Sequence, residues 1–165
     1  MADNKWSGFK MTGDYKTGVR SLYEAWATPA GLERWFLRKA NFYTIPRRVR
    51  EPKEFILTED TYEWYWHGWD DSTFEKGRIL EANGTDFLKF TFSGGSIVSV
   101  FIHSRNGLSV IELTQENIPE EADLSKNLYV QCQIGWTFYL TNLKSVIEGG
   151  ADLRNKRTDL NSIFK

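Results

Sequence analysis

Four strand-like segments separated by turn residues occupy the middle of the chain. The segments are rich in Phe, Ile, Val and Thr, which favour strands, and they are Phe74–Ala82, Asp86–Ser93, Ser96–Ser104 and Leu108–Ile118. The pairs between them are Asn83-Gly84, Gly94-Gly95 and Asn106-Gly107. Because Asn and Gly tolerate the positive φ of a two-residue hairpin turn, the pattern predicts an antiparallel meander.

A helical period replaces this alternation between Leu124 and Glu148. Apolar residues recur there at spacings of three and four, which places them on one helix face. They are Leu128, Cys132, Trp136, Tyr139, Leu143 and Ile147. Ile134 and Phe138 widen this stripe, so we expect much of the surface of a long helix to be buried. The Gly-Gly pair after Glu148 predicts its end.

Shorter elements precede the meander. Trp6–Tyr15 is expected to be a strand, and Val19–Ala27 a helix with apolar residues on one face. Leu32, Trp35 and Phe36 predict a second short helix, with Pro29 near its first turn. A weak strand follows at Asn41–Ile45. Residues 46–53 are charged and twice interrupted by proline, which predicts a solvated loop; its basic residues are Arg47, Arg48, Arg50 and Lys53.

The order of these elements predicts an α+β fold. A curved antiparallel sheet wrapped around the long C-terminal helix, with two short helices after the first strand, buries every apolar stripe at once. Such a sheet does not close tightly on a helix everywhere, so we also expect an internal groove. The chain, residues 1–165, is predicted to be one domain, with its core over about residues 6–150 and a polar C-terminal tail.

Composition narrows the classes of protein. A net charge of −1 and a pI near 6.2 provide no field to attract nucleic acid. No apolar run approaches the length of about twenty residues that a membrane span needs, and the first ten residues lack the apolar region of a secretory signal. The one cysteine, Cys132, suits a reducing compartment. We therefore expect a cytoplasmic protein.

The segment TYEWYWHGWDD, residues 61–71, concentrates aromatic side chains. In an extended strand, alternation places Tyr62, Trp64 and Trp66 on one face and Glu63, Tyr65 and His67 on the other. Three large rings facing the long helix would be core, cavity lining or both. Packing and ligand contact both remain open at this point.

Catalytic and metal chemistry has little support in the sequence. His67 and His103 are the only histidines, and with Cys132 they lack the spacing of a zinc site. There is no G-x-S-x-G motif and no phosphate-binding glycine motif. An acid–base pair of Glu63 with Asp70 or Asp71 stays open. We therefore predict no metal, no cofactor and no catalytic residue, and we favour a binding protein over an enzyme.

Several stretches together resemble a known family. They are VRSLYEAWATPAGLERWF, YEWYWHGW, the strand at Gly77-Arg78-Ile79, LKFTF and GWTFYLTNLKSVIEGGADLR. The match extends from about Gly8 to Arg154 and is similar to single-domain bacterial relatives of the C-terminal domain of the heat-shock chaperone ATPase activator. The resemblance implies the START-like (SRPBCC) helix-grip fold, whose cavity holds lipids, sterols, hormones or polyketides in that superfamily and sometimes hosts catalysis. The activator also uses a separate N-terminal domain, which we do not expect in these 165 residues.

These observations lead to a ranked set of functions. The first is binding of a small, largely apolar molecule or lipid in the groove between sheet and helix. The residues expected to contact it are Trp64, Trp66, His67, Arg78, Phe90, Phe92, Trp136 and Tyr139. The second is a chaperone-accessory or other protein-interaction module that uses the outer surface. The third is a hydrolase or cyclase that uses the same groove.

Overall fold

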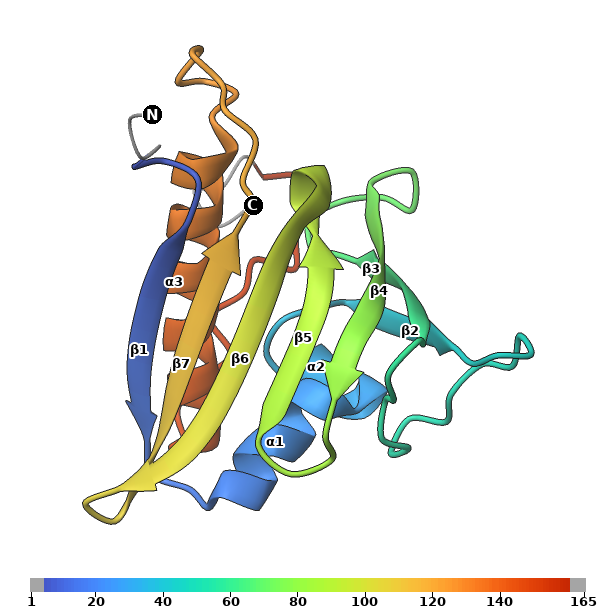
Figure 1. Cartoon of the computed structure of the whole chain (residues 1–165), viewed down its shortest axis with the longest axis vertical. Coiled ribbons are helices and arrows are strands. Elements are labelled where there is room, and N and C mark those ends of the chain that lie inside the picture. The colour runs from blue at the N-terminus through green and yellow to red at the C-terminus, as the bar shows by residue number, and fades with distance from the viewer. Residues whose placement is uncertain (1–4, 161–165) are drawn as a thin grey trace.

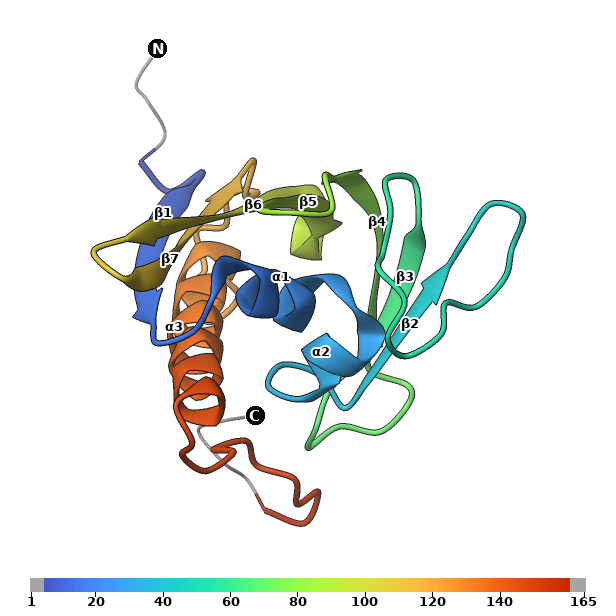
Figure 2. The same ribbon diagram turned by 90° about the horizontal axis from the view of Figure 1, so that it is seen from below.

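The computed structural model describes residues 5–160 (Figure 1). Its elements are β1 (Phe9–Tyr15), α1 (Val19–Ala27), α2 (Pro29–Glu33), β2 (Lys39–Tyr43), β3 (Thr61–Tyr65), β4 (Phe74–Ala82), β5 (Phe87–Phe92), β6 (Ser96–Arg105), β7 (Leu108–Glu116) and α3 (Leu128–Ile147). The strands form one antiparallel sheet in the order β1-β7-β6-β5-β4-β3-β2. Figure 2 shows the sheet curving around all three helices, with α3 lying under β1 and β7. The predicted α+β helix-grip architecture is confirmed.

The meander from β4 to β7 is present, but its three turns differ. Only Asn106-Gly107 forms a two-residue turn, with both residues at positive φ between the paired Arg105 and Leu108. The first turn is longer because the Asn83 side chain accepts hydrogen bonds from three backbone N–H groups that follow it. The second turn is a short 3-10 segment, Ser93–Gly95. The turn residues therefore predicted where the hairpins turn, but they did not predict the type of each turn.

The second short helix ends earlier than predicted. α2 stops at Glu33, and Trp35 and Phe36 follow it in a turn with their rings fully buried. The Trp35 indole N–H donates to the carbonyl of Ala25 in α1, at 2.9 Å. This bond and the Thr28 side chain, which accepts from Gly31 N–H at 3.0 Å, fix the angle between α1 and α2.

The long helix begins at Leu128, four residues after the predicted start. Asn127 is its N-cap, and its side-chain oxygen accepts from the N–H of Val130 at 3.0 Å. Ile134 was expected to widen the buried stripe, but it is 63% exposed. Phe138, the other added residue, is half-buried and contacts the Tyr139 ring at 5.1 Å. Helical periodicity thus identified the buried face, and Ile134 falls outside it.

The charged loop of residues 46–53 is more ordered than a solvated loop. The Arg50 side chain is 8% exposed and makes two hydrogen bonds to Asp60, at 2.6 and 3.0 Å. It also donates to Glu54 at 2.6 Å. Arg50 therefore anchors the loop to the segment before β3, and the expectation of a fully solvated basic patch is wrong at this residue.

The C-terminal segment also packs against the fold beyond the predicted core limit of residue 150. Arg154 is 9% exposed, and its guanidinium donates to the carbonyls of Leu37, Glu33 and Arg34 at 2.9–3.0 Å. Two of these carbonyls lie at the end of α2, where helical partners are missing. Asp152 pairs with the same guanidinium at 2.7 Å. The segment thus holds the turn that carries Trp35 and Phe36.

We predict that Arg154→Ala lowers the free energy of unfolding by about 2–4 kcal/mol, because three buried carbonyls lose their charged donor. Urea denaturation followed by tryptophan fluorescence measures the change. Arg157→Ala, which removes an exposed pair with Asp159, is the matched control and should change stability by less than about 0.5 kcal/mol. Equal effects of the two substitutions would contradict the anchoring role of Arg154.

Candidate ligand-binding pocket

Aromatic side chains fill most of the space between the sheet and the helices. Trp64 of β3 stacks on Tyr62 at a centroid distance of 3.8 Å and contacts Phe90 at 5.3 Å. Phe36 stacks on Trp136 of α3 at 5.2 Å. These rings are at most 2% exposed. The internal groove expected from the sequence is therefore filled by side chains over much of its length.

A hollow lies beside the N-terminal half of α3, and we call it the aromatic pocket. Its volume is about 170 Å³. Its lining residues are Phe36, Trp66, Phe92, Ser93, Leu128, Gln131, Cys132, Gly135, Trp136 and Tyr139. Five of these carry aromatic rings and none is basic. The lining suits a ligand with a large apolar surface and offers nothing to neutralise an anion.

The expected contact residues divide into three groups. Trp66, Phe92, Trp136 and Tyr139 line the aromatic pocket. Trp64 and Phe90 lie in the filled core and line no part of it. His67 is half-buried outside it, and Arg78 is exposed and faces Glu59 at 3.7 Å.

Other pocket residues were not singled out from the sequence. Phe36 was assigned only to the second short helix, and Gly135 lies within the long helix α3. A Cβ added at Gly135 would meet no atom within 4 Å. The missing side chain thus leaves open space, and a glycine inside a long helix was the available signal for it.

Buried hydrogen bonds hold the wall formed by α3. Gln115 of β7 is 0% exposed, and its amide oxygen accepts from the Trp136 indole N–H at 2.9 Å. Its amide nitrogen donates to Ser96 Oγ at 2.9 Å and lies 3.3 Å from Cys132 Sγ. Burial raises the pKa of the Cys132 thiol and raises the pKa of Tyr139 to about 12. Both side chains therefore stay neutral near pH 7.

Glu75 brings a carboxylate to the edge of this pocket. It lies directly opposite Trp64 in the β3–β4 ladder, so its side chain shares the inner face of the sheet. Its Oε2 accepts from Ser93 Oγ, a lining residue, at 3.0 Å. Burial raises the pKa of Glu75. Among residues 5–160 it has no ion-pair partner, unlike the inward-facing Asp60.

The other carboxylates considered for catalysis are held elsewhere. Glu63 lies on the opposite face of β3 and accepts from Tyr43 Oη at 3.1 Å. Asp70 accepts from the N–H of Ser72, and Asp71 pairs with Arg38. Burial, with Arg154 nearby, lowers the pKa of His67. These groups do not converge on one point, and no set of three His, Cys, Asp or Glu in the described part of the chain could hold a metal ion.

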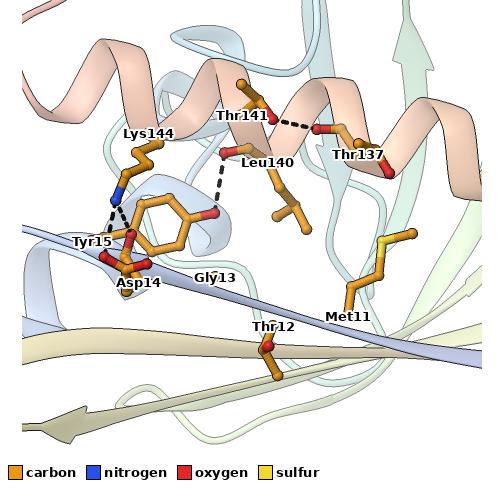
Figure 3. Close-up of a pocket in the computed structure, with 9 residues that line it drawn as sticks. All are labelled: Met11, Thr12, Gly13, Asp14, Tyr15, Thr137, Leu140, Thr141 and Lys144. Atoms are coloured by element: carbon orange, nitrogen blue, oxygen red, sulfur yellow. Dashed lines mark hydrogen bonds and ion pairs between the residues drawn. The ribbon is translucent and has the colours of Figure 1, made fainter.

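A second hollow of about 360 Å³ lies between β1 and α3 (Figure 3). Its charged groups and the Tyr15 hydroxyl already have partners within the lining. Lys144 donates to the carbonyl and the carboxylate of Asp14, at 2.6 and 3.0 Å, and Tyr15 Oη donates to the carbonyl of Leu140 at 3.1 Å. These bonds tie the edge strand to the helix. We therefore place the candidate site in the aromatic pocket, where side chains converge on space that they do not fill.

The raised pKa of Glu75 predicts how its removal changes stability with pH. The folded protein binds this proton more tightly than the unfolded chain, so the stabilisation is complete below the unfolded pKa of about 4.3 and is lost as pH rises through the folded value. The free energy of unfolding of Glu75→Gln relative to the parent should therefore increase from pH 4 to pH 7. Urea titrations at pH 4, 5.5 and 7 measure this difference. A difference that falls with pH would show that the carboxylate is stabilised by its surroundings.

Comparisons with known proteins agree with this architecture. The family model described as Activator of Hsp90 ATPase homolog 1-like protein matches residues 16–148. Similar solved structures include a Staphylococcus saprophyticus protein (TM-score 0.69, 14% identity, covering 90% of this chain and 96% of that one). They also include the Aha1 dimer of Colwellia psychrerythraea (TM-score 0.65, 15% identity, covering 87% of this chain and 97% of that one). A third is an Hsp90 activator of Plasmodium falciparum (TM-score 0.61, 18% identity, covering 87% of this chain and 96% of that one).

No curated protein gave a significant sequence match. Within residues 5–160, no helix is long and apolar enough to cross a membrane. The family match spans most of the chain, from the end of β1 to the end of α3. The chain therefore belongs to the Activator of Hsp90 ATPase homolog 1-like family.

Proposed function

We propose that this protein binds a small, largely apolar molecule in the aromatic pocket. The observation that carries the proposal is the group of five aromatic side chains around space left open by Gly135. Protein interiors are otherwise close-packed, and away from the pocket Phe36 and Trp136 contact the rings of Trp35, Trp64 and Trp26. A pocket that persists in such a core is the expected site for a ligand.

The size of the pocket limits the ligand. Its volume of about 170 Å³ is below the roughly 300–1,000 Å³ typical of pockets for drug-sized molecules. It is close to the engineered cavity of about 150 Å³ that binds benzene. The proposed ligand is therefore the size of one ring or a short branched chain, or is the end of a larger molecule. A whole sterol or a complete lipid tail would need the rings of the core to move.

The expected affinity is modest. Burying about 150 Å² of ligand surface at about 25 cal/mol per Å² contributes roughly 4 kcal/mol, which corresponds to a Kd near 1 mM. Association costs weaken this value, and specific polar contacts strengthen it. Tyr139 Oη, Ser93 Oγ and the Gln131 amide are the neutral polar groups in the lining that could orient a ligand.

A second function, contact with an Hsp90-type chaperone, is favoured by apolar side chains exposed near the start of α3. Leu124, Val130 and Ile134 are 76%, 37% and 63% exposed, and exposed apolar clusters commonly serve protein contacts. The family name points to the same partner. Ile134→Glu should weaken a complex measured by calorimetry under reducing conditions. Absence of a complex with the parent protein would reject this second function.

Substitutions at Gly135 test the pocket directly. We predict that Gly135→Leu abolishes binding of toluene and 3,3-dimethylbutan-1-ol, because its side chain would occupy the open space. Gly135→Ala is the matched control. It should retain binding and raise the free energy of unfolding by about 0.5–1 kcal/mol, since alanine favours the helix. Ligand-observed NMR measures binding and urea denaturation measures stability.

The pocket assignment is contradicted if folded Gly135→Leu binds both probes as the parent does. It is equally contradicted if the parent binds neither probe at concentrations up to 10-fold above the expected Kd of about 1 mM.

A further inference from the structure

The aromatic pocket and Glu75 together indicate the charge of the ligand. This inference rests on the proposed function, because it assigns a ligand class to the same pocket. Three rings at the pocket, those of Phe36, Trp66 and Tyr139, contact one another at centroid distances of 4.9–5.8 Å. Phe92 and Trp136 continue the wall at 5.4 Å from each other. Phe36 is stacked on both Trp35 and Trp136, at interplanar angles of 23° and 22°, so it supports the wall with its edge. Cations are attracted to the electron-rich faces of rings, which leaves Trp66, Phe92 and Tyr139 as the rings of the lining that can offer a face.

The lining has no positive charge of its own. None of its residues is Lys, Arg or His, and no cationic side chain contributes to the electrostatic surroundings of Glu75. By contrast, the well-buried Arg50 and Arg154 elsewhere in the fold each meet a carboxylate. Glu75, near the edge of the pocket, is a carboxylate on the inner face of the sheet that has no cationic partner among residues 5–160.

Glu75 does not line the aromatic pocket, but its carboxylate is joined to the lining through Ser93. Its cross-strand neighbour is Trp64, so it lies on the inner face of the sheet. It accepts a hydrogen bond at 3.0 Å from the hydroxyl of Ser93, which is a lining residue of the pocket. The carboxylate has a second oxygen with no hydrogen bond to another described residue. A half-buried carboxylate with one weak donor is costly unless something binds it. Ionisable residues that are partly buried without a charge partner are frequent in binding sites.

We propose that the aromatic pocket is a cage for a quaternary or tertiary methylammonium group, with Glu75 as its counter-charge. A trimethylammonium group is apolar on its surface and positive overall, which matches a wall of rings beside one carboxylate. It is also small enough for about 170 Å³. The same group occurs in free choline-like molecules and in phosphatidylcholine headgroups. The shared chemistry is what the pocket recognises, and basic residues for an adjoining phosphate are absent from its lining.

The test compares choline with 3,3-dimethylbutan-1-ol, which has the same shape without the charge. Titrations at pH 8 by calorimetry or NMR give both dissociation constants for the parent protein. We expect choline to bind at least about tenfold more tightly, in keeping with a desolvated cation–π site. Glu75→Gln should remove most of this preference and leave the affinity for the neutral alcohol within about twofold.

Two controls make the result specific. Glu63→Gln removes a carboxylate from the neighbouring strand on the opposite face, and it should leave the preference for choline intact. Trp66→Leu keeps an apolar side chain but removes a ring from the cage, and it should weaken choline more than the alcohol. Circular dichroism melting curves confirm that each variant is folded.

The outcomes separate the two proposals. If the alcohol binds as tightly as choline, or if Glu75→Gln keeps the preference, the cation cage is wrong while the apolar pocket stands. If neither molecule binds the parent, both proposals fail. Sedimentation with phosphatidylcholine vesicles, with phosphatidylglycerol vesicles as the control, then distinguishes a lipid headgroup from a free ligand. Binding to phosphatidylcholine vesicles that choline displaces supports a headgroup. Binding of free choline without binding to the vesicles supports a soluble ligand.

Discussion

The stacking of Phe36 on Trp136 is the contact on which the rest of this structure depends. It joins the turn after α2 to the long helix α3 at a centroid distance of 5.2 Å and an interplanar angle of 22°. Phe36 also touches Trp35, Trp64 and Trp66, so one ring connects the turn after α2, the sheet and α3. Because aromatic pairs contribute more than their buried area alone, this cluster stabilises the curve of the sheet. It also leaves only a small pocket of about 170 Å³ beside these rings.

Buried charged side chains also join segments that are distant in the sequence. Arg50 ties the loop before β3 to Asp60, and Arg154 ties the C-terminal segment to the turn that carries Phe36. Each is buried and each is compensated by carboxylates or carbonyls, as buried charges must be. Glu75 departs from this pattern because no cationic side chain within residues 5–160 pairs with it. The exception lies beside the pocket, which links the electrostatics of the fold to its proposed function.

The sequence predicted the architecture well because local patterns determine it. Alternation and turn residues identified β4 to β7, and the three-and-four spacing identified α1 and the buried face of α3. The predicted pocket residues were only partly those that line it. Trp66, Phe92, Trp136 and Tyr139 do so, whereas Trp64 and Phe90 are equally apolar but lie deeper in the core. Periodicity tells which side faces inward, and it carries no information on how completely the inside is filled.

The missed residues depend on contacts between distant segments. Glu75 is 11 residues from Trp64 in sequence and becomes its neighbour only through the register of β3 and β4. Arg154 reads as part of a polar tail, yet its partners lie about 120 residues earlier. Gly135 gave a local signal, but its meaning required knowing that the space beside it is open. Long-range pairing and packing density are the two quantities that a single sequence does not supply.

The most direct measurement of the central claim is a crystal structure determined under xenon pressure. Xenon enters apolar cavities of this size without needing polar contacts. We expect a xenon atom in the aromatic pocket, between Trp66, Phe92 and Tyr139 and next to Gly135. A structure in which the pocket has collapsed, or in which xenon occupies other sites and leaves this one without density, would contradict it.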